Sequence, residues 1–446
     1  MYIVVIGLGE VGKHLLGVLQ ADGHDVVAID KNPSAVAYAE EHFDVACLTG
    51  YGASQEILDR ANVKTADLVV AVSDHDEVNL IAALAAKQLG ATRVVARAQG
   101  NEWARWTEGI RYGLLGVDVV INPRVLVGQE LGRVARSHGA SDVIDLAQDR
   151  VELVQMTMTT RMANKPLAKL QLPEDALVAA YVRDGDVVVP GGADVLLPGD
   201  VVYLIGRPAA ILQAEDLFST RREANRVLVV GGGVVGQSLA RQILPFGAQV
   251  TIVERDPEVA ERLAAEHDDV TVVQGDGTDG DLLQEIEIAT YDLMAAVTRE
   301  DEINLMASLM AKRAGVPRTA AIVQRADYVP IYRQLGIDIV LSPRTVASDQ
   351  ILRFARSGQL HSLHVLEEGA AEVVELTALA SCAATSKPLR RLQLPTGSLI
   401  AALVRGDTIL VPGGDDVIEP GDRVILMTTR ESRASIERLF RGRRGL

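Results

Sequence analysis

Two patterns of hydrophobic and polar residues alternate along this chain. In the first, short runs of Val, Ile, Ala and Leu are separated by segments with apolar residues at helical spacing. Strands that alternate with helices at this spacing indicate right-handed βαβ units and a parallel sheet. The pattern predicts strands at 2–6, 25–29, 45–48 and 67–72, and helices at 11–21, 33–42, 54–61 and 76–89.

The second pattern consists of short strands separated by turn residues. Asp184-Gly185 and the Gly-rich steps after Pro190 and Pro198 are typical of hairpins and tight turns. A smaller domain of the α+β class is therefore expected after the first one. Its predicted strands cover residues 151–159, 177–183, 187–189 and 200–205.

The whole succession occurs twice, with an offset of about 224 residues between the copies. Five segments recur in the same order, which makes a chance match implausible. We therefore predict four domains, large, small, large and small, with a polar linker near residues 219–226. The matched segments are 5–12 with 229–236, 71–80 with 296–305, 116–124 with 336–344, 165–173 with 387–395, and 190–200 with 412–422; the predicted domains are 1–140, 141–219, 226–360 and 361–446.

A glycine motif follows the first strand of each half. Gly7-x-Gly9-x-x-Gly12 lies between a predicted strand and a predicted helix, and Asp30 ends the next strand. In a dinucleotide-binding fingerprint, such glycines allow a tight turn and the approach of a pyrophosphate to the helix N-terminus, and the acid binds the adenosine ribose. The residues predicted to form the two loops and ribose contacts are Gly7, Leu8, Gly9, Glu10, Val11, Gly12 and Asp30 in the first half, and Gly231, Gly232, Gly233, Val234, Val235, Gly236 and Glu254 in the second.

Two other interpretations of the glycines stay open. The domains could keep them for packing alone and bind no nucleotide. The first motif also reads as the start of a P-loop, with Lys13 after the third glycine, but His14 follows in place of the Ser or Thr that would hold Mg²⁺. An acid at each ribose position favours NAD or an adenosine nucleotide over NADP, although Lys31 and Arg255 stand beside the acids.

Further candidate contacts follow other predicted strands. The carboxyl ends of parallel strands meet at one edge of the sheet, where open α/β sheets bind ligands. Arginines there could bind phosphate, or could form ordinary surface ion pairs. The candidates are Ser73, Asp74, Thr298 and Arg299 after the fourth strands, Gly50, Tyr51, Asp276 and Gly277 after the third, and Arg97 and Arg325 after the fifth.

The acids after the fourth strands, the helices that end the large domains and the histidines are also considered as functional residues. The acids Asp74, Asp76, Glu77, Asp301 and Glu302 are expected to cap the following helices, with divalent-cation binding as the alternative. The helices at 124–137 and 344–357 belong either to the core of their own domain or to a contact with the neighbouring half or subunit. The eight histidines form no constellation shared by the two halves, so we expect no catalytic residues and no metal site.

Composition limits the possible partners. The chain has 44 Lys and Arg residues against 60 Asp and Glu, a formal net charge of −16, which disfavours nucleic acids and polybasic attachment to lipid. The longest stretch without these charges is 14 residues, at 227–240, whereas a spanning helix needs about 20 apolar residues. The N-terminus lacks a signal-peptide pattern and the two cysteines are isolated, so we expect a cytoplasmic protein.

Together these motifs resemble one family closely. The order GxGxxG, acid, Gly-Asp-Gly-Thr, Val-(Ser/Thr)-x-x-Asp-Glu-x-Asn-Leu and Asp-x-Val-(Asn/Ser)-Pro, in tandem, is similar to the TrkA family of regulatory subunits of bacterial Trk potassium-uptake systems, which are built from two RCK units. The first copy departs from the family at residues 50–53, which read Gly-Tyr-Gly-Ala.

The resemblance implies a fold and a function. The fold would be two tandem Rossmann-like, doubly wound parallel-sheet domains, each followed by a small α+β domain. The function would be noncatalytic sensing of NAD(H) and ATP or ADP by a homotetramer, docked through protein contacts on the cytoplasmic face of a membrane K⁺ translocator of the TrkH/TrkG type. The alternatives are an NAD-dependent oxidoreductase, or a regulator of another ion channel or efflux system.

Overall fold

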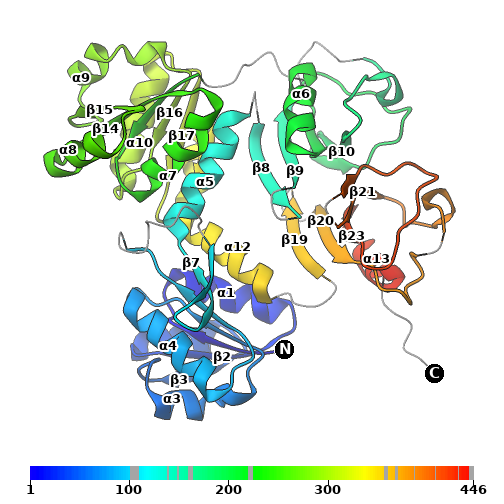
Figure 1. Ribbon diagram of the computed structural model, residues 1–446, viewed down its shortest axis with the longest axis horizontal. Helices are drawn as coiled ribbons and strands as arrows, with labels where there is room; N and C mark the ends of the chain where they lie inside the picture. Colours follow the sequence, from blue (N-terminus) through cyan, green and yellow to red (C-terminus); the bar gives the residue numbers. More distant parts are fainter. Residues whose placement is uncertain are drawn as a thin grey trace. The chain divides into compact units, whose positions relative to one another are not determined.

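The computed structural model describes residues 1–100, 110–137, 140–147, 150–158, 164–218, 225–355, 360–366, 370–385, 387–406, 408–429 and 431–440. Most of the predicted linker at 219–226, residue 159 of a predicted strand and residues 356–357 of a predicted helix lie outside these ranges. The chain forms two compact units, one made of Met1–Arg133 with Asn225–Ala355 and the other of Val134–Ala224 with Arg356–Leu446. Each half of the sequence therefore contributes one sheet to each unit (Figure 1).

The first large domain has a seven-stranded sheet. Its strands are β1 (Tyr2–Ile6), β2 (Asp25–Asp30), β3 (Ala46–Thr49), β4 (Leu68–Ala71), β5 (Val94–Arg97), β6 (Ile110–Leu114) and β7 (Val117–Ile121), in the order β3-β2-β1-β4-β5-β7-β6. The sheet is parallel apart from β6, which pairs antiparallel with β7. Leu115 and Gly116 both have positive φ, as a two-residue hairpin requires. The sequence pattern predicted only parallel strands here, and this edge hairpin corrects it.

The second large domain has a fully parallel, six-stranded sheet in the order β15-β14-β13-β16-β17-β18. Helices connect the successive strands β1 to β5 and β13 to β18, so the doubly wound fold expected from the sequence is confirmed. The strands are β13 (Arg226–Val230), β14 (Gln249–Glu254), β15 (Val270–Gln274), β16 (Leu293–Ala296), β17 (Arg318–Ile322) and β18 (Ile339–Leu341). The helices are α1 (Glu10–Ala21), α2 (Pro33–His42), α3 (Gln55–Arg60) and α4 (Asp76–Leu89) in the first domain, and α7 (Val234–Ile243), α8 (Pro257–Glu266), α9 (Gly280–Glu285), α10 (Asp301–Ala314) and α11 (Val329–Gln334) in the second.

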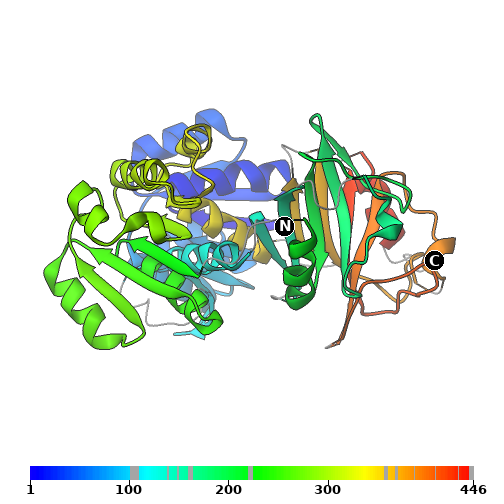
Figure 2. The ribbon, with the colours of Figure 1, turned by 90° about the horizontal axis from the view of Figure 1, so that it is seen from above.

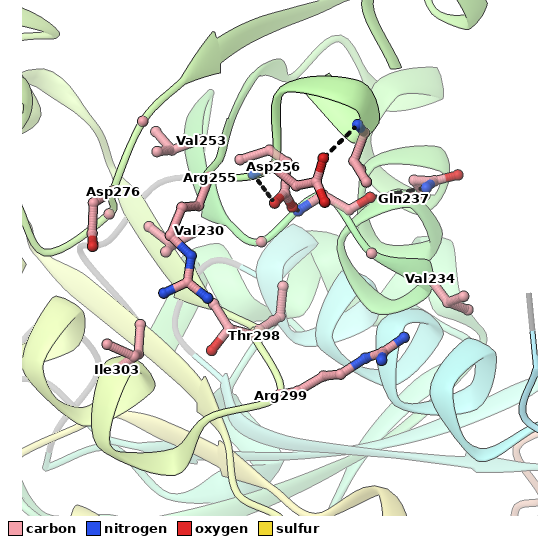
Figure 3. A pocket seen from close by; sticks show the side chains of 18 of the residues that line it. Val230, Val234, Gln237, Val253, Arg255, Asp256, Asp276, Thr298, Arg299 and Ile303 are labelled. Carbon is pink, nitrogen blue, oxygen red and sulfur yellow. Dashed lines mark hydrogen bonds between the residues drawn. The ribbon is translucent and has the colours of Figure 1, made fainter. Parts of the chain in front are cut away.

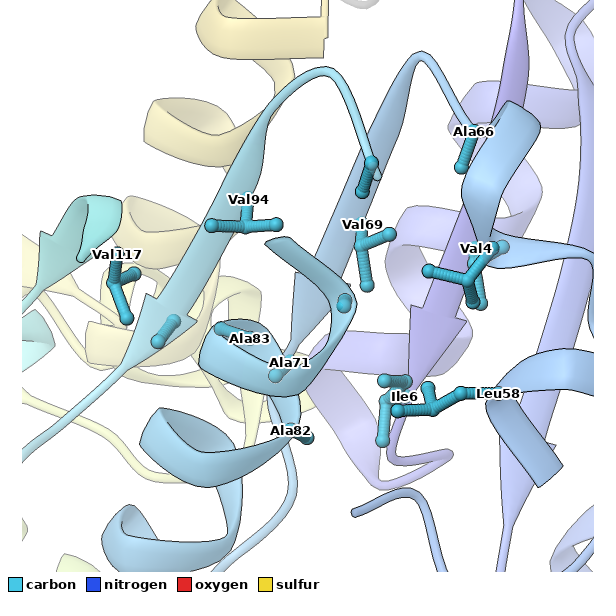
Figure 4. Close-up of a cluster of buried hydrophobic side chains, with 14 of the residues drawn as sticks. Val4, Ile6, Leu58, Ala66, Val69, Ala71, Ala82, Ala83, Val94 and Val117 are labelled. Atoms are coloured by element: carbon cyan, nitrogen blue, oxygen red, sulfur yellow. The ribbon is translucent and has the colours of Figure 1, made fainter. Parts of the chain in front are cut away.

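The core of the first large domain explains its Val- and Ala-rich strands. Strands covered by helices on both faces are buried on both sides, so they read as continuous apolar runs. Val69 and Ala71 on β4 face the small side chains of α4, such as Ala83, and Ile6 on the neighbouring strand β1 lies beside Leu58 of α3 (Figure 4). The alanines let the helix approach the sheet closely, and this packing fixes the sheet edge from which the candidate site residues project.

The two large domains exchange their final helices within the first unit. Helix α5 (Pro123–Arg136) follows the first sheet but packs on α7 of the second domain, and α12 (Pro343–Ala355) follows the second sheet but packs on α1 of the first. A Cβ on Gly128 or Gly132 of α5 would lie 2.5 Å or 2.4 Å from the Cβ of Ser238 or Gln242. Of the two interpretations of these helices, the structure supports the contact with the neighbouring half.

The second unit contains the two small domains. Each has a five-stranded antiparallel sheet, in the orders β11-β10-β12-β9-β8 and β19-β20-β23-β21-β22 (Figure 2). One apolar core contains residues of both sheets, including Leu153, Tyr203, Val373 and Met427. The elements are β8 (Ala140–Leu146), β9 (Val151–Thr157), β10 (Ala176–Arg183), β11 (Asp186–Val188), β12 (Val201–Gly206), α6 (Pro208–Phe218), β19 (Leu360–Leu366), β20 (Ala371–Thr377), β21 (Ser398–Arg405), β22 (Thr408–Leu410), β23 (Arg423–Thr429) and α13 (Arg433–Phe440).

Among the described residues, no helix is both long enough and apolar enough to span a bilayer.

A buried ion pair closes the Pro-Gly-Asp turn of each small domain. The Asp200 carboxylate, 4% exposed, accepts hydrogen bonds from Arg183 Nε at 2.9 Å and Nη2 at 2.6 Å, and from the Leu197 N–H at 2.7 Å. Arg405 binds Asp422 in the same way in the second small domain. The bonds from Arg183 hold the pKa of Asp200 below its usual value, although burial acts in the opposite direction.

We expect Asp200→Asn to lower the free energy of unfolding of the second unit by about 2 kcal/mol at neutral pH, less than for a fully buried pair because Arg183 is partly exposed. Because the folded-state pKa is lowered, the stabilisation is complete above about pH 5 and is lost as the pH falls through that pKa. Urea unfolding followed by circular dichroism from pH 3 to 7 measures it. Asp194→Asn, whose carboxylate accepts from the Gly191 N–H, is the control, and an equal effect there would contradict the prediction.

Candidate nucleotide-binding site

The glycine loop of the second large domain joins β13 to α7. Gly231 has a φ of +112°, which favours glycine, and a Cβ on Gly236 would lie 2.1 Å from the Gly231 carbonyl oxygen. The first domain repeats this with Gly7, at +100°, and Gly12, whose Cβ would lie 1.9 Å from the Gly7 oxygen. The first and third glycines of each motif are therefore needed for the loop itself.

The middle glycines differ from their neighbours. Gly9 and Gly233 have ordinary φ values, −69° and −71°, and a Cβ on either would meet nothing within 4 Å. Both stand at the N-cap of a helix and provide no side-chain capping bond to the N–H groups of the first helical turn. Packing inside the chain thus gives no reason for glycine at these two positions, whereas close approach of a pyrophosphate does.

The predicted ribose acids end the second strand of each large domain. In the second, Glu254 Oε2 accepts from the Gly232 N–H at 2.7 Å and Oε1 from the Asp256 N–H at 2.9 Å. In the first, the two oxygens of Asp30 accept from the Leu8 N–H at 2.6 Å and the Asn32 N–H at 2.8 Å. Each acid is thereby held against its glycine loop, and each oxygen keeps acceptor capacity for a sugar hydroxyl.

The next turn fixes the acids in place. Asn32 and Asp256 cap α2 and α8 by accepting from the N–H two residues later, and proline occupies the first helical turn in both. The strand must therefore end directly after Asp30 or Glu254. Lys31 and Arg255 lie between acid and cap, and Arg255 forms an exposed ion pair with Glu300 at 3.2 Å.

A cavity of about 840 Å³ lies beside the second glycine loop (Figure 3). Side chains from the loop, from the turn after β14 and from the turn after β16 surround it. Most predicted site residues of this half line it: Gly231, Gly232, Gly233, Val234, Glu254, Arg255, Asp276, Gly277, Thr298 and Arg299. Val235 and Gly236 are buried in α7 behind the loop and do not line the cavity, and neither does Arg325.

Sequence reasoning missed several lining residues on the two flanking helices. Gln237 and Arg241 follow Val234 by three and seven residues on α7, and Arg262 and Glu266 follow Val259 in the same way on α8. Such spacing places each set on one helix face. For α7 the signal was present in the sequence, since polar residues continue the helix face that begins at the predicted contact Val234.

The turn after the third strand differs between the copies. Asp276 Oδ1 accepts from the Thr278 hydroxyl at 2.7 Å and from its N–H at 2.8 Å, and these bonds lower the pKa of Asp276. In the first domain Tyr51 takes this place and is 51% exposed, with Ala53 replacing the threonine. Gly50 and Gly277 both sit where a Cβ would strike an isoleucine or valine of the core. In this turn only the second copy therefore presents a carboxylate.

A fully buried asparagine fixes the turn after the fourth strand in both domains. Asn304 accepts from the N–H and the hydroxyl of Thr298 at 2.9 Å and 2.8 Å, and donates to the carbonyls of Thr298 and Ile322. Asn79 makes the same four bonds with Ser73 and Arg97. These asparagines position the predicted contacts Ser73 and Thr298, and were noted in the sequence only as part of the repeat.

Asp76 and Asp301, the first residues of α4 and α10, do not form the capping hydrogen bonds predicted for them, whereas Glu77 and Glu302 lie in the first helical turns as expected. Asp76 is buried and accepts from the N–H groups of Gln99 and Gly100 at 2.8 Å and 2.7 Å, and Asp301 binds the Gln324 N–H in the same way. Their carboxylates bind the loop after the fifth strand and do not cap their own helices. Among the described residues, no group of three or more His, Cys, Asp and Glu side chains is placed to hold a metal ion.

Arg97 and Arg325 are not equivalent, contrary to the sequence interpretation. Arg97 is the last residue of β5, and the residue in its place on β17 is Ile322, since Asn79 and Asn304 bind these two carbonyls. The buried Arg97 guanidinium donates to Asp74 at 3.0 Å, whereas Arg325 contacts the Tyr328 ring and Asp327. The charge of Asp74 is thus balanced by Arg97 in the first domain, whereas the equivalent residue of the second domain, Arg299, is positively charged.

Comparison with known families agrees with this arrangement. The TrkA-N domain model matches residues 3–123 and 227–343, and the TrkA-C domain model matches residues 151–219 and 373–441. The chain belongs to the TrkA family. The tandem organisation inferred from the repeat and the resemblance noted in the sequence are therefore confirmed.

Named relatives of this TrkA-family chain cover its whole length. It is 32% identical to Trk system potassium uptake protein TrkA homolog 1 of Methanosarcina mazei, over 99% of this chain and 100% of that protein. The homolog of Archaeoglobus fulgidus is 33% identical over the same shares. Among solved structures, the GsuK channel bound to NAD superposes with a TM-score of 0.60 at 19% identity, covering 98% of this chain and 78% of that one, which shows a shared fold.

Proposed function

We propose that this TrkA-family chain is a noncatalytic regulatory subunit of potassium transport that senses NAD(H) or ATP and ADP. The observation that carries the proposal is the open space at Gly9 and Gly233, where packing within the chain does not require glycine and close approach of a pyrophosphate does. Membership of the TrkA family, whose named relatives are Trk potassium-uptake proteins, supplies the link to K⁺ transport. The GsuK structure of the same fold is bound to NAD.

The second site fits an adenine nucleotide group by group. The N–H groups at the start of α7 and the positive end of its dipole would bind the phosphates. Glu254, held by the Gly232 N–H, would accept from the ribose hydroxyls and repel a 2′-phosphate, which favours NAD(H) over NADP(H). Arg255 and Arg299 line the cavity and supply positive charge for the phosphate groups. In the first site, Asp30 and Gly9 take the corresponding roles.

The exchanged helices would couple binding to movement. A ligand shifts a conformational equilibrium only through its different affinity for the two states. Helix α12 packs on α1, which follows the first glycine loop, and α5 packs on α7, which follows the second. A nucleotide at either loop would therefore contact a pair of helices that connects the two large domains. Such a change would be passed to a membrane-embedded K⁺ translocator of the TrkH/TrkG type, on whose cytoplasmic face a ring of four copies would dock.

Calorimetric titration of the full chain with NADH, NADPH, ATP and ADP tests this function. We expect binding of at least one of NADH, ATP and ADP, weaker binding of NADPH, and a loss of about tenfold or more, about 1.4 kcal/mol, for Asp30→Ala or Glu254→Ala. Thr290→Ala, at an exposed turn away from the cavity, is the control. Binding of none of the four nucleotides would refute the proposal, and oxidation of bound NADH in the presence of cell extract would favour an oxidoreductase.

A further inference from the structure

Helix α5 runs parallel to α7 in a fixed register. Gly128 lies against Ser238, Gly132 lies against Gln242, and the Ser238 hydroxyl donates to the Val125 carbonyl at 2.9 Å. Moving back one turn from Gly128 places Arg124 beside the first turn of α7. An arginine from the first half of the chain therefore stands where the second glycine loop opens into its helix.

Helices α12 and α1, at the first large domain, have the same register as α5 and α7. Arg344, the counterpart of Arg124 on α12, lies with its Nη1 3.9 Å from Glu10 Oε2, at the first residue of α1. The counterpart of Glu10 on α7 is Val234. The first glycine loop thus provides a carboxylate for the arginine from the other half, whereas the second provides none.

Arg124 shares its surroundings with Arg299. Both line a recess of about 390 Å³, and Arg299 also lines the nucleotide cavity of the second domain. Burial lowers the pKa of Arg124, and the charges of Arg299 and Arg97 lower it further, against the opposite effect of Asp76. Its guanidinium group donates to the Gln99 carbonyl at a long distance, 3.3 Å. Two guanidinium groups that line one recess favour an anion between them.

Three acids of the first domain also line this recess, Asp74, Asp76 and Glu77. Asp74 pairs with Arg97, and one oxygen of Asp76 binds the two backbone N–H groups of the loop after β5, whereas Asp76 Oδ1 is buried without a hydrogen-bond partner. Within the described residues Arg299 forms no ion pair, and its side chain extends from the turn after Thr298 at the cavity wall (Figure 3). The positive charge of Arg299 at the wall of the second cavity is therefore available to a ligand.

We propose that Arg124, from the first half of the chain, completes the nucleotide site of the second half by binding, with Arg299, the terminal phosphate of a nucleoside di- or triphosphate. This rests on the proposed function and names the ligand class of its second site. Planar guanidinium groups bind phosphate oxygens in pairs, which suits a terminal phosphate. In the first site the two corresponding positions carry carboxylates, Glu10 beside Arg344 and Asp74 beside Arg97, which disfavours a terminal phosphate there.

The test measures ATP, ADP and AMP binding to full-length chains in which one site is weakened. In an Asp30→Ala background the remaining binding reports on the second site, and in a Glu254→Ala background on the first. We expect Arg124→Gln to weaken ATP and ADP at the second site about tenfold or more and to leave AMP within twofold. A general packing defect would instead weaken all three nucleotides alike.

Matched variants complete the experiment. Arg344→Gln, at the equivalent position of the other lobe, should leave ATP binding at the second site unchanged, and Arg124→Lys should recover part of the loss in Arg124→Gln. Unchanged ATP affinity of Arg124→Gln in the Asp30→Ala background would overturn the inference, as would an equal loss for AMP or an equal loss at the first site. If the unmodified chain bound no nucleotide, the proposed function itself would fail, which is a separate result.

Discussion

Gly233→Ala should fold like the unmodified chain and lose nucleotide affinity at the second site by about 10- to 100-fold, about 1.4 to 2.7 kcal/mol. The backbone at Gly233 has φ −71° and ψ −170°, which alanine can adopt, and the added Cβ meets no atom within 4 Å. The methyl group would instead occupy the space through which phosphate oxygens reach the N–H groups of α7. Calorimetry in the Asp30→Ala background, with thermal unfolding in parallel, measures both effects.

Gly236→Ala is the contrasting variant. Its Cβ would lie 2.1 Å from the Gly231 carbonyl oxygen, a backbone atom that cannot move without displacing the loop. We expect a loss of about 3 kcal/mol or more in the stability of the second large domain, seen as faster hydrogen exchange across β13 and α7. If Gly233→Ala instead destabilised the domain and left binding intact, the second glycine would have a packing role and the nucleotide interpretation of both loops would be wrong.

Asn304→Leu should have the largest effect among the buried polar residues of the site. Leucine has a similar size but leaves the Thr298 N–H and the Ile322 carbonyl without partners in a buried place, at a cost of about 3 to 4 kcal/mol. The turn that carries Thr298 and Arg299 loses its anchor, so nucleotide affinity should fall as well. Hydrogen exchange of peptides from 293–322 and calorimetry measure the two losses.

Ser308→Ala provides the control for Asn304→Leu, because Ser308 is equally buried on α10 and donates only to the Asn304 carbonyl at 2.7 Å. Its removal should cost about 1 kcal/mol and leave the affinity unchanged. A similar loss of affinity in both variants would show that the helix as a whole, and not the asparagine, positions the turn.

Features set by neighbouring residues could be predicted from the sequence. The glycine loop, the acid at the end of the next strand and the helix cap that follows it are all determined within about 25 residues, and a strand, a turn and a helix leave clear local patterns. The repeat added strength, since each motif appears twice. These signals were enough for the doubly wound fold and for ten of the 22 residues that line the second cavity.

Features set by distant contacts could not be predicted in this way. The pattern of α5 and α12 shows one apolar face but not which domain that face covers, and Gly128 has a reason to be small only once Ser238 lies against it. Asp76 reads as a helix cap, and only the position of the loop after β5 reveals its partners. Arg97 and Arg325 were matched by residue type, whereas the bonds from Asn79 and Asn304 decide the true register.

The exchange of α5 and α12 bears on how such a chain could have arisen. A half-length ancestor with one large domain would have formed a homodimer by exchanging the final helix of that domain between two identical subunits. The symmetry of such a dimer keeps the ligand sites of the two subunits identical. Gene duplication and fusion turn that pair into one polypeptide and free each copy to drift. The two copies differ in this way at equivalent positions, where the first has Tyr51 and Asp74 and the second has Asp276 and Arg299. A symmetric dimer could register only one kind of ligand there, whereas the fused chain has room for two.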